Sequence, residues 1–155
     1  MKLWTACVLV FFTAMAQAQD GFPPTCQALS VQGETLTLEP KQPEVFLIQN
    51  LSSNDIWITH PVSEPSASAG WSSRLEAGNW SALTVDKKAF ELSCIESRPG
   101  HEQQIACEGV LAVCGWASVK LPANANGTFW AGENMTLAAL TAELGGRGYV
   151  VPVTP

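Results

Sequence analysis

The sequence has few basic residues, only two histidines, and no long apolar run after its first 15 residues. Eight lysines and arginines stand against fourteen aspartates and glutamates, and the only basic cluster is Lys87-Lys88. Because binding to a phosphate backbone needs several cationic side chains acting together, we expect no nucleic-acid partner. Binding to an anionic membrane surface is disfavoured for the same reason.

Motifs of the common catalytic chemistries are also missing. There is no G-x-S-x-G nucleophile elbow, and GGRG follows a predicted helix instead of opening one, so it is no phosphate loop. The eleven glutamates are scattered, without a pair placed for glycoside cleavage. A metal site needs grouped thiolates or histidines, and the only histidines are His60 and His101. We therefore expect a non-enzymatic protein with no catalytic residues, no metal and no cofactor.

The N-terminus, MKLWTACVLVFFTAMAQAQD, resembles an export signal. Lys2 gives a positive start, residues 3–15 are apolar, and the AQA at 16–18 places small residues where a signal peptidase cleaves. The apolar run is too short for a permanent membrane span. We predict a signal peptide over residues 1–18, and a periplasmic or secreted mature chain with no membrane span. That chain has seven basic and fourteen acidic residues, a net charge of −7.

Four cysteines remain after the signal peptide: Cys26, Cys94, Cys107 and Cys114. None is in the C-x-x-C spacing typical of zinc or redox sites. An even number of cysteines in an exported chain predicts disulfides. Two disulfides leave three possible connectivities, and a count of cysteines does not choose among them.

Short β-rich runs make up most of the mature chain. Residues 45–50 and 56–62 are apolar runs on either side of the polar LSSND, and residues 71–76 and 80–86 flank AGN. We interpret each pair as a β-hairpin. FELSCIE, residues 90–96, alternates as a half-buried strand does.

Two further segments follow that strand. RPGH, residues 98–101, has proline and glycine at the central positions that a type II turn prefers. CEGVLAVC, residues 107–114, is either a short helix or a buried strand, because periodicity alone cannot decide.

One helix is predicted near the C-terminus. Its apolar positions are spaced helically, Asn134 or Thr136 caps it, and Gly145-Gly146 ends it. Many short strands with one helix predict a mainly β fold, a β-sandwich of the Ig-like or Greek-key type. We expect a flexible lead-in at residues 19–25 and a single disulfide-stapled domain at residues 26–155.

The mature chain is rich in tryptophan, with five residues. Trp57 and Trp130 lie in apolar strands and are expected in the core. Trp71 and Trp80 border glycine-containing turns. Exposed there, they would be candidates to stack on sugar rings or to anchor a protein partner.

Several runs occur in the order found in the Legionella enhanced-entry EnhB-like proteins, which this chain resembles from about Pro24 to Val151. They include AGNWSALTVDKKAFELSC, ACEGVLAVCGW and SVKLPANANGTFWAGEN. The most specific is C-x-x-V-L-x-V-C-x-aromatic, from Cys107 to Trp116. All four mature cysteines match the family pattern, whereas Gly109 and Ala112 stand where it usually has acidic residues.

The resemblance implies an exported bacterial protein, named for a locus that promotes host-cell entry, with no known catalysis or ligand. We expect a protein partner in the envelope or at the host interface, and an envelope glycan-binding or glycan-cleaving protein is the alternative. We favour a Cys94–Cys107 disulfide, which would clamp two antiparallel runs across the turn at 98–101. Cys26–Cys114 would then tie the N-terminal segment to the core.

Overall fold

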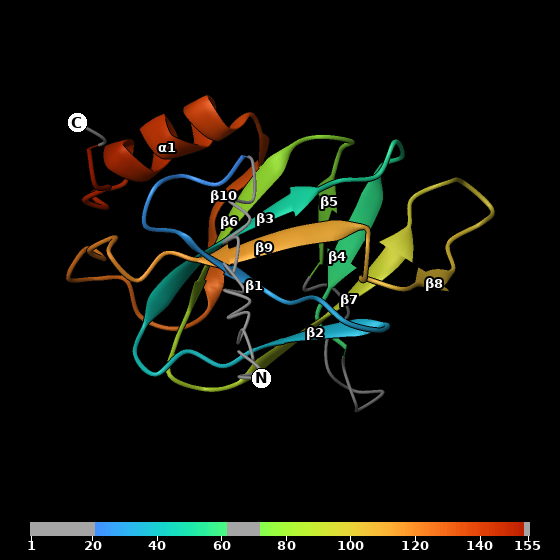
Figure 1. Cartoon of the computed structure of the whole chain (residues 1–155), viewed down its shortest axis with the longest axis horizontal. Coiled ribbons are helices and arrows are strands. Elements are labelled where there is room, and N and C mark those ends of the chain that lie inside the picture. Colours follow the sequence, from blue (N-terminus) through green and yellow to red (C-terminus); the bar gives the residue numbers. More distant parts are fainter. Residues whose placement is uncertain (1–20, 62–71, 154–155) are drawn as a thin grey trace, which may run out of the picture.

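The strands of the computed structural model form two antiparallel sheets (Figure 1). The structure describes residues 21–61 and 72–153. Sheet A has the order β1 (Gln27–Leu29), β9 (Leu111–Gly115), β3 (Glu44–Asn50), β6 (Trp80–Val85) and β10 (Phe129–Met135). Sheet B has the order β2 (Thr35–Leu38), β7 (Phe90–Glu96), β4 (Ile56–Thr59) and β5 (Ser72–Leu75), and β8 (Gln104–Ile105) also pairs with β7. The predicted β-sandwich is confirmed.

Hydrophobic side chains are buried on both faces of sheet A. Between the two sheets, side chains such as Ile48 and Leu92 are fully buried. On the other face of sheet A lies α1 (Leu137–Gly146), where Leu140 and Leu144 are fully buried (Figure 1). A strand buried on both faces has no polar face, which explains why β3 and β6 are nearly continuous apolar runs.

The connections after β3 and β5 cross from one sheet to the other. β3 is in sheet A and β4 in sheet B, whereas β5 is in sheet B and β6 in sheet A. The strands were correctly predicted, but both predicted hairpins are wrong. The end of β3 hydrogen-bonds to the second connection instead of to β4: Asn50 N–H donates to Asn79 O at 3.1 Å, and Gly78 N–H donates to Asn50 O at 2.9 Å.

The side chain of Asn50 holds these two connections together. It is fully buried. Its Nδ2 donates to the carbonyls of Asn54 (2.7 Å) and Leu75 (3.0 Å). Its Oδ1 accepts from the Ser52 N–H (2.9 Å) and hydroxyl (2.7 Å). Both amide hydrogens and the carbonyl oxygen of Asn50 are thereby satisfied, as a buried polar group requires.

Asp55 adds a second link between the connections. Its carboxylate accepts hydrogen bonds from the Arg74 guanidinium and from the Ala77 N–H. The hydrogen bond from Arg74 is the main reason that the pKa of Asp55 lies below its ordinary value. The two connections therefore form one polar unit at one end of the sandwich.

The segment from β7 to β9 contains the predicted turn at residues 98–101. It also shows whether CEGVLAVC, residues 107–114, is a helix or a strand. His101 N–H donates to Arg98 O at 2.9 Å, and Gly100 has φ +77°, so the expected type II turn is confirmed. Residues 111–115 form β9, and its buried side chains show that CEGVLAVC contains a core strand instead of a helix.

The start of α1 agrees with one of the two predicted caps. The Thr136 hydroxyl accepts a hydrogen bond from the Ala139 N–H, at 3.3 Å, which satisfies an otherwise unpaired amide of the first turn. Asn134, the alternative cap, belongs to β10.

The predicted stop at Gly145-Gly146 is confirmed, since Gly146 is the last residue of the helix. The helix ends because Gly148 is left-handed, with φ +88°. Tyr149 N–H donates to Leu144 O and Gly148 N–H to Gly145 O, the two bonds of a Schellman motif.

Close packing of α1 on β10 depends on the absence of a side chain at Gly132. A Cβ there would lie 2.5 Å from Leu140 Cδ1. We expect Gly132→Ala to lower the free energy of unfolding by about 1–3 kcal/mol, as overpacking of a core does. The matched control is Gly145→Ala, where a Cβ meets nothing within 4 Å, and it should stabilise by about 0.5–1 kcal/mol. Urea unfolding measures both, and equal effects would contradict this packing.

Candidate functional site

Of the two tryptophans proposed as binding residues, Trp80 is the one that lies in the described part of the chain. Trp80 is only 5 % exposed, so it is not the exposed ring that the binding hypothesis requires. It is buried on the α1 side of sheet A, where the Phe22 ring packs edge-on at 5.7 Å and 76°. This contact also places part of the predicted lead-in, residues 21–25, against the domain. Trp71 lies outside the described residues.

The cysteines are paired as predicted. The disulfides are Cys26–Cys114, with a Cα–Cα distance of 5.5 Å, and Cys94–Cys107, with 5.4 Å. Cys94, Cys107 and Cys114 are fully buried. Their role is structural, and disulfides of this kind are typical of oxidising compartments.

The structure places the two histidines in different surroundings. His60 stacks on Phe90, with ring centroids 4.2 Å apart, and its Nδ1 lies 2.6 Å from Glu91 O. His101 is exposed on the turn that follows β7. In residues 21–61 and 72–153, no three His, Cys, Asp or Glu side chains are grouped as metal ligands.

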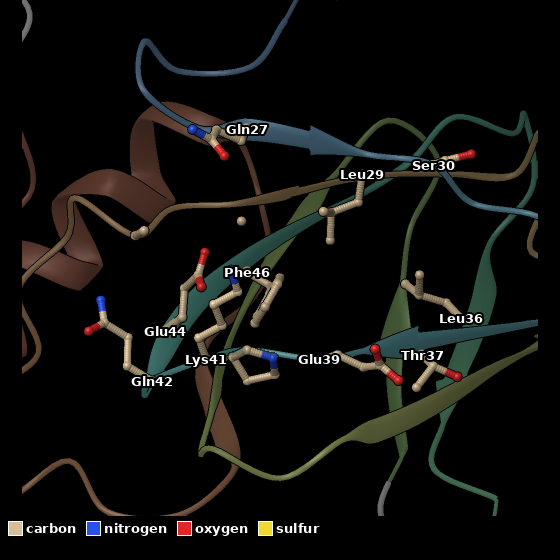
Figure 2. Close-up of a pocket in the computed structure, with 13 residues that line it drawn as sticks. Gln27, Leu29, Ser30, Leu36, Thr37, Glu39, Lys41, Gln42, Glu44 and Phe46 are labelled. Atoms are coloured by element: carbon tan, nitrogen blue, oxygen red, sulfur yellow. The ribbon is translucent and has the colours of Figure 1, made fainter.

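A groove of about 670 Å³ lies between β1 and β2, the edge strands of the two sheets (Figure 2). Within the described part of the chain, no strand pairs with the outer edge of either one. The volume is in the range of ordinary ligand sites. The groove therefore brings an accessible hollow and two unpaired strand edges to one side of the sandwich.

The groove has an apolar floor and a polar rim. Leu29, Leu36 and Phe46 contribute the floor, and all three belong to or pack on the core between the sheets. The charged side chains that line it are Glu39, Lys41 and Glu44. An apolar floor with a few placed polar groups is typical of binding sites.

Glu44 is the most distinctive group in the groove. It lies at the start of β3, on the face that carries Phe46, and its side chain points into the groove (Figure 2). Burial raises the pKa of its carboxyl above the ordinary value. A Cβ at Gly115 would lie 2.5 Å from Glu44 Oε1, so the carboxylate occupies the space that the missing side chain of Gly115 leaves.

Sequence reasoning missed this site. Glu44 looked like one more solubilising glutamate, and Gly115 like part of the cysteine run. The available signal was strand alternation: Glu44, Phe46 and Ile48 fall on one face, and two of these three are core residues. A carboxylate that continues a buried face needs a reason, whereas one on a polar face does not.

No family model, no curated protein and no solved structure matches this chain. No helix in the described ranges is long and apolar enough to cross a membrane.

Proposed function

We propose that this chain is an exported, non-enzymatic, EnhB-like binding protein of the periplasm or the extracellular space. The two disulfides, the predicted signal peptide and the resemblance given above support export. In this proposal the groove between β1 and β2 receives a segment of a protein partner, in the envelope or at the host interface. Such an interaction would be its contribution to entry into host cells.

The observation that carries this proposal is the pair of open strand edges beside an apolar floor. An edge strand presents unpaired N–H and C=O groups at the spacing of another strand. Proteins use such edges to bind extended peptides, with backbone hydrogen bonds for affinity and neighbouring pockets for specificity. The groove offers both parts together, because Leu29 and Leu36 lie below the edges.

The alternative is an envelope glycan-binding or glycan-cleaving protein. The presence of two carboxylates, Glu39 and Glu44, in one groove favours it. The aromatic lining argues against it. Sugar rings stack on exposed aromatic faces, and Phe46, the aromatic side chain lining the groove, is 3 % exposed.

The test blocks the groove with a large side chain introduced at its rim. Ala117 is exposed and lines the groove, whereas Ala123 is exposed and does not. We expect the mature protein to capture a protein from envelope or host-cell lysates by photo-crosslinking. Ala117→Trp should lower the yield at least tenfold, because the indole occupies the groove, and Ala123→Trp should leave it unchanged.

The same variants are then tested against peptidoglycan and a glycan array. Glycan binding or cleavage that Ala117→Trp abolishes, with no crosslinked protein, would replace the proposal by its alternative. Equal crosslinking by both variants would place the partner elsewhere on the molecule.

A further inference from the structure

The Glu44 carboxylate lies in the groove, and the described residues supply it with no counter-charge. No hydrogen bond or ion pair joins it to any other described residue, whereas Asp55, Glu96 and Glu143 each pair with an arginine. Lys41 lines the same groove but is not within ion-pair distance of Glu44. A half-buried carboxylate is costly to leave unpaired, and the raised pKa of Glu44 agrees with that cost.

The surroundings of Glu44 favour a strong interaction with a cation. The carboxylate lies against the backbone of Gly115, and the same position on Gly115 is 3.4 Å from the Phe46 ring. Apolar neighbours on these sides lower the local dielectric and strengthen attraction to an opposite charge. Because Gly115 leaves the space that Oε1 occupies, the carboxylate has a defined place from which to accept hydrogen bonds.

The net charge of the groove and that of the whole chain also favour a cationic partner. Two carboxylates and one ammonium group line the groove. The chain after the predicted signal peptide has a net charge of −7. A basic segment is therefore attracted at long range and meets a net negative groove at short range.

A bound peptide in the extended conformation of a β-strand could contact both ends of the groove. Figure 2 shows Glu44 and Gln27 towards one end, and Leu36 and Thr37 towards the other. In an extended peptide, residues two positions apart point to the same side and are about 6.8 Å apart. An extended peptide lying along the groove can therefore present one side chain to Glu44 and another, on the same side of its strand, to the end that Leu36 lines.

We propose that the groove recognises an extended peptide segment through one lysine or arginine, which pairs with Glu44, and an aliphatic residue on the same side of the strand, towards Leu36. The segment adds a strand at the β1 or β2 edge, and the basic side chain supplies the counter-charge of the Glu44 carboxylate. This inference rests on the proposed function, since it names the chemistry of the partner that the groove binds.

The test uses the oxidised mature protein and a displayed library of random heptapeptides. Selection against the Ala117→Trp variant first removes peptides that bind outside the groove. We expect peptides kept by the wild type to be enriched at least threefold in lysine or arginine at one position, with an aliphatic residue an even number of positions away. Replacing that basic residue by glutamine in a labelled synthetic peptide should weaken binding about tenfold, as loss of a charged hydrogen-bonded pair does.

Two variants probe the carboxylate itself, and a third is the control. Glu44→Gln should abolish the preference for the basic peptide over its glutamine counterpart. Gly115→Ala keeps the carboxylate but displaces it, because the new Cβ would lie 2.5 Å from Oε1, and should reduce the preference. Glu39→Gln removes a charge from the same groove and should keep most of the preference.

The outcomes separate this inference from the proposed function. Peptides that need an open groove but show no basic preference, or a preference that survives Glu44→Gln, overturn the role of Glu44 and leave peptide binding intact. A library that yields no peptide dependent on Ala117 overturns both.

Discussion

Removing the Cys26–Cys114 disulfide should lower the free energy of unfolding by about 4–5 kcal/mol, against about 3 kcal/mol for Cys94–Cys107. Chain-entropy arguments relate the stabilisation to the length of the loop that the crosslink closes in the unfolded chain. The two loops differ greatly, with separations of 88 and 13 residues. The cysteine pair that ties down the N-terminal segment is therefore expected to be the more stabilising one.

The comparison needs two double variants, Cys26→Ala with Cys114→Ala and Cys94→Ala with Cys107→Ala. Each loses one disulfide and leaves no free thiol. Urea unfolding with linear extrapolation gives both free energies. An equal or larger loss in the Cys94–Cys107 variant would show that packing of these fully buried sulfurs, and not loop entropy, sets the order.

The second large effect is expected at Asn50. Asn50→Ala leaves the Leu75 carbonyl without its partner at a buried position, and the Ser52 amide without its partner at a half-buried one. Each unsatisfied buried group costs about 1–3 kcal/mol. We therefore expect the free energy of unfolding to fall by about 3 kcal/mol, a loss comparable to that of the shorter disulfide.

Two further variants test the cause of this loss. Asn50→Asp preserves shape but turns an oxygen towards the carbonyls that Nδ2 now faces, so it should cost at least as much at neutral pH. Asn126→Ala, at an exposed asparagine, should change the free energy by less than about 0.5 kcal/mol. A mild effect of Asn50→Asp would mean that side-chain volume matters more than the hydrogen bonds.

Local sequence predicted the elements better than their pairing. Alternation in FELSCIE and apolar runs around β3 and β6 identified strands, because each strand buries its own side chains. Whether a polar connection returns within a sheet or crosses to the other depends on distant partners. The N–H of Asn50 bonds to Asn79, 29 positions along the chain, and nothing in LSSND indicates that contact.

The burial of Trp80 shows a similar limit. Its position after AGN suggested a turn, beside which the ring could be either exposed or buried. The ring is covered by α1 and Phe22, which come from opposite ends of the mature chain. The Cys26–Cys114 pairing was more predictable, since four cysteines allow only three connectivities.

The candidate site could not be found from local sequence because its parts come from three distant segments. Glu44, Gly115 and Leu29 are ordinary residues in their own runs. They meet because β1, β9 and β3 are neighbours in sheet A. The groove can be located only when the register of those strands is known, because the register decides which side chains lie next to one another.

Sheet A contains no two neighbouring strands that are consecutive along the chain. Each pair of neighbouring strands in this sheet joins distant segments of the chain. Strand β1, for example, can pair only after β9 has been synthesised. Folds dominated by such non-local pairs form slowly, in milliseconds to seconds. A nascent chain lacking residues 111–135 lacks β9 and β10, so it cannot complete this sheet and folds later. If the chain is exported as proposed, that delay suits its passage in the unfolded state through a narrow channel.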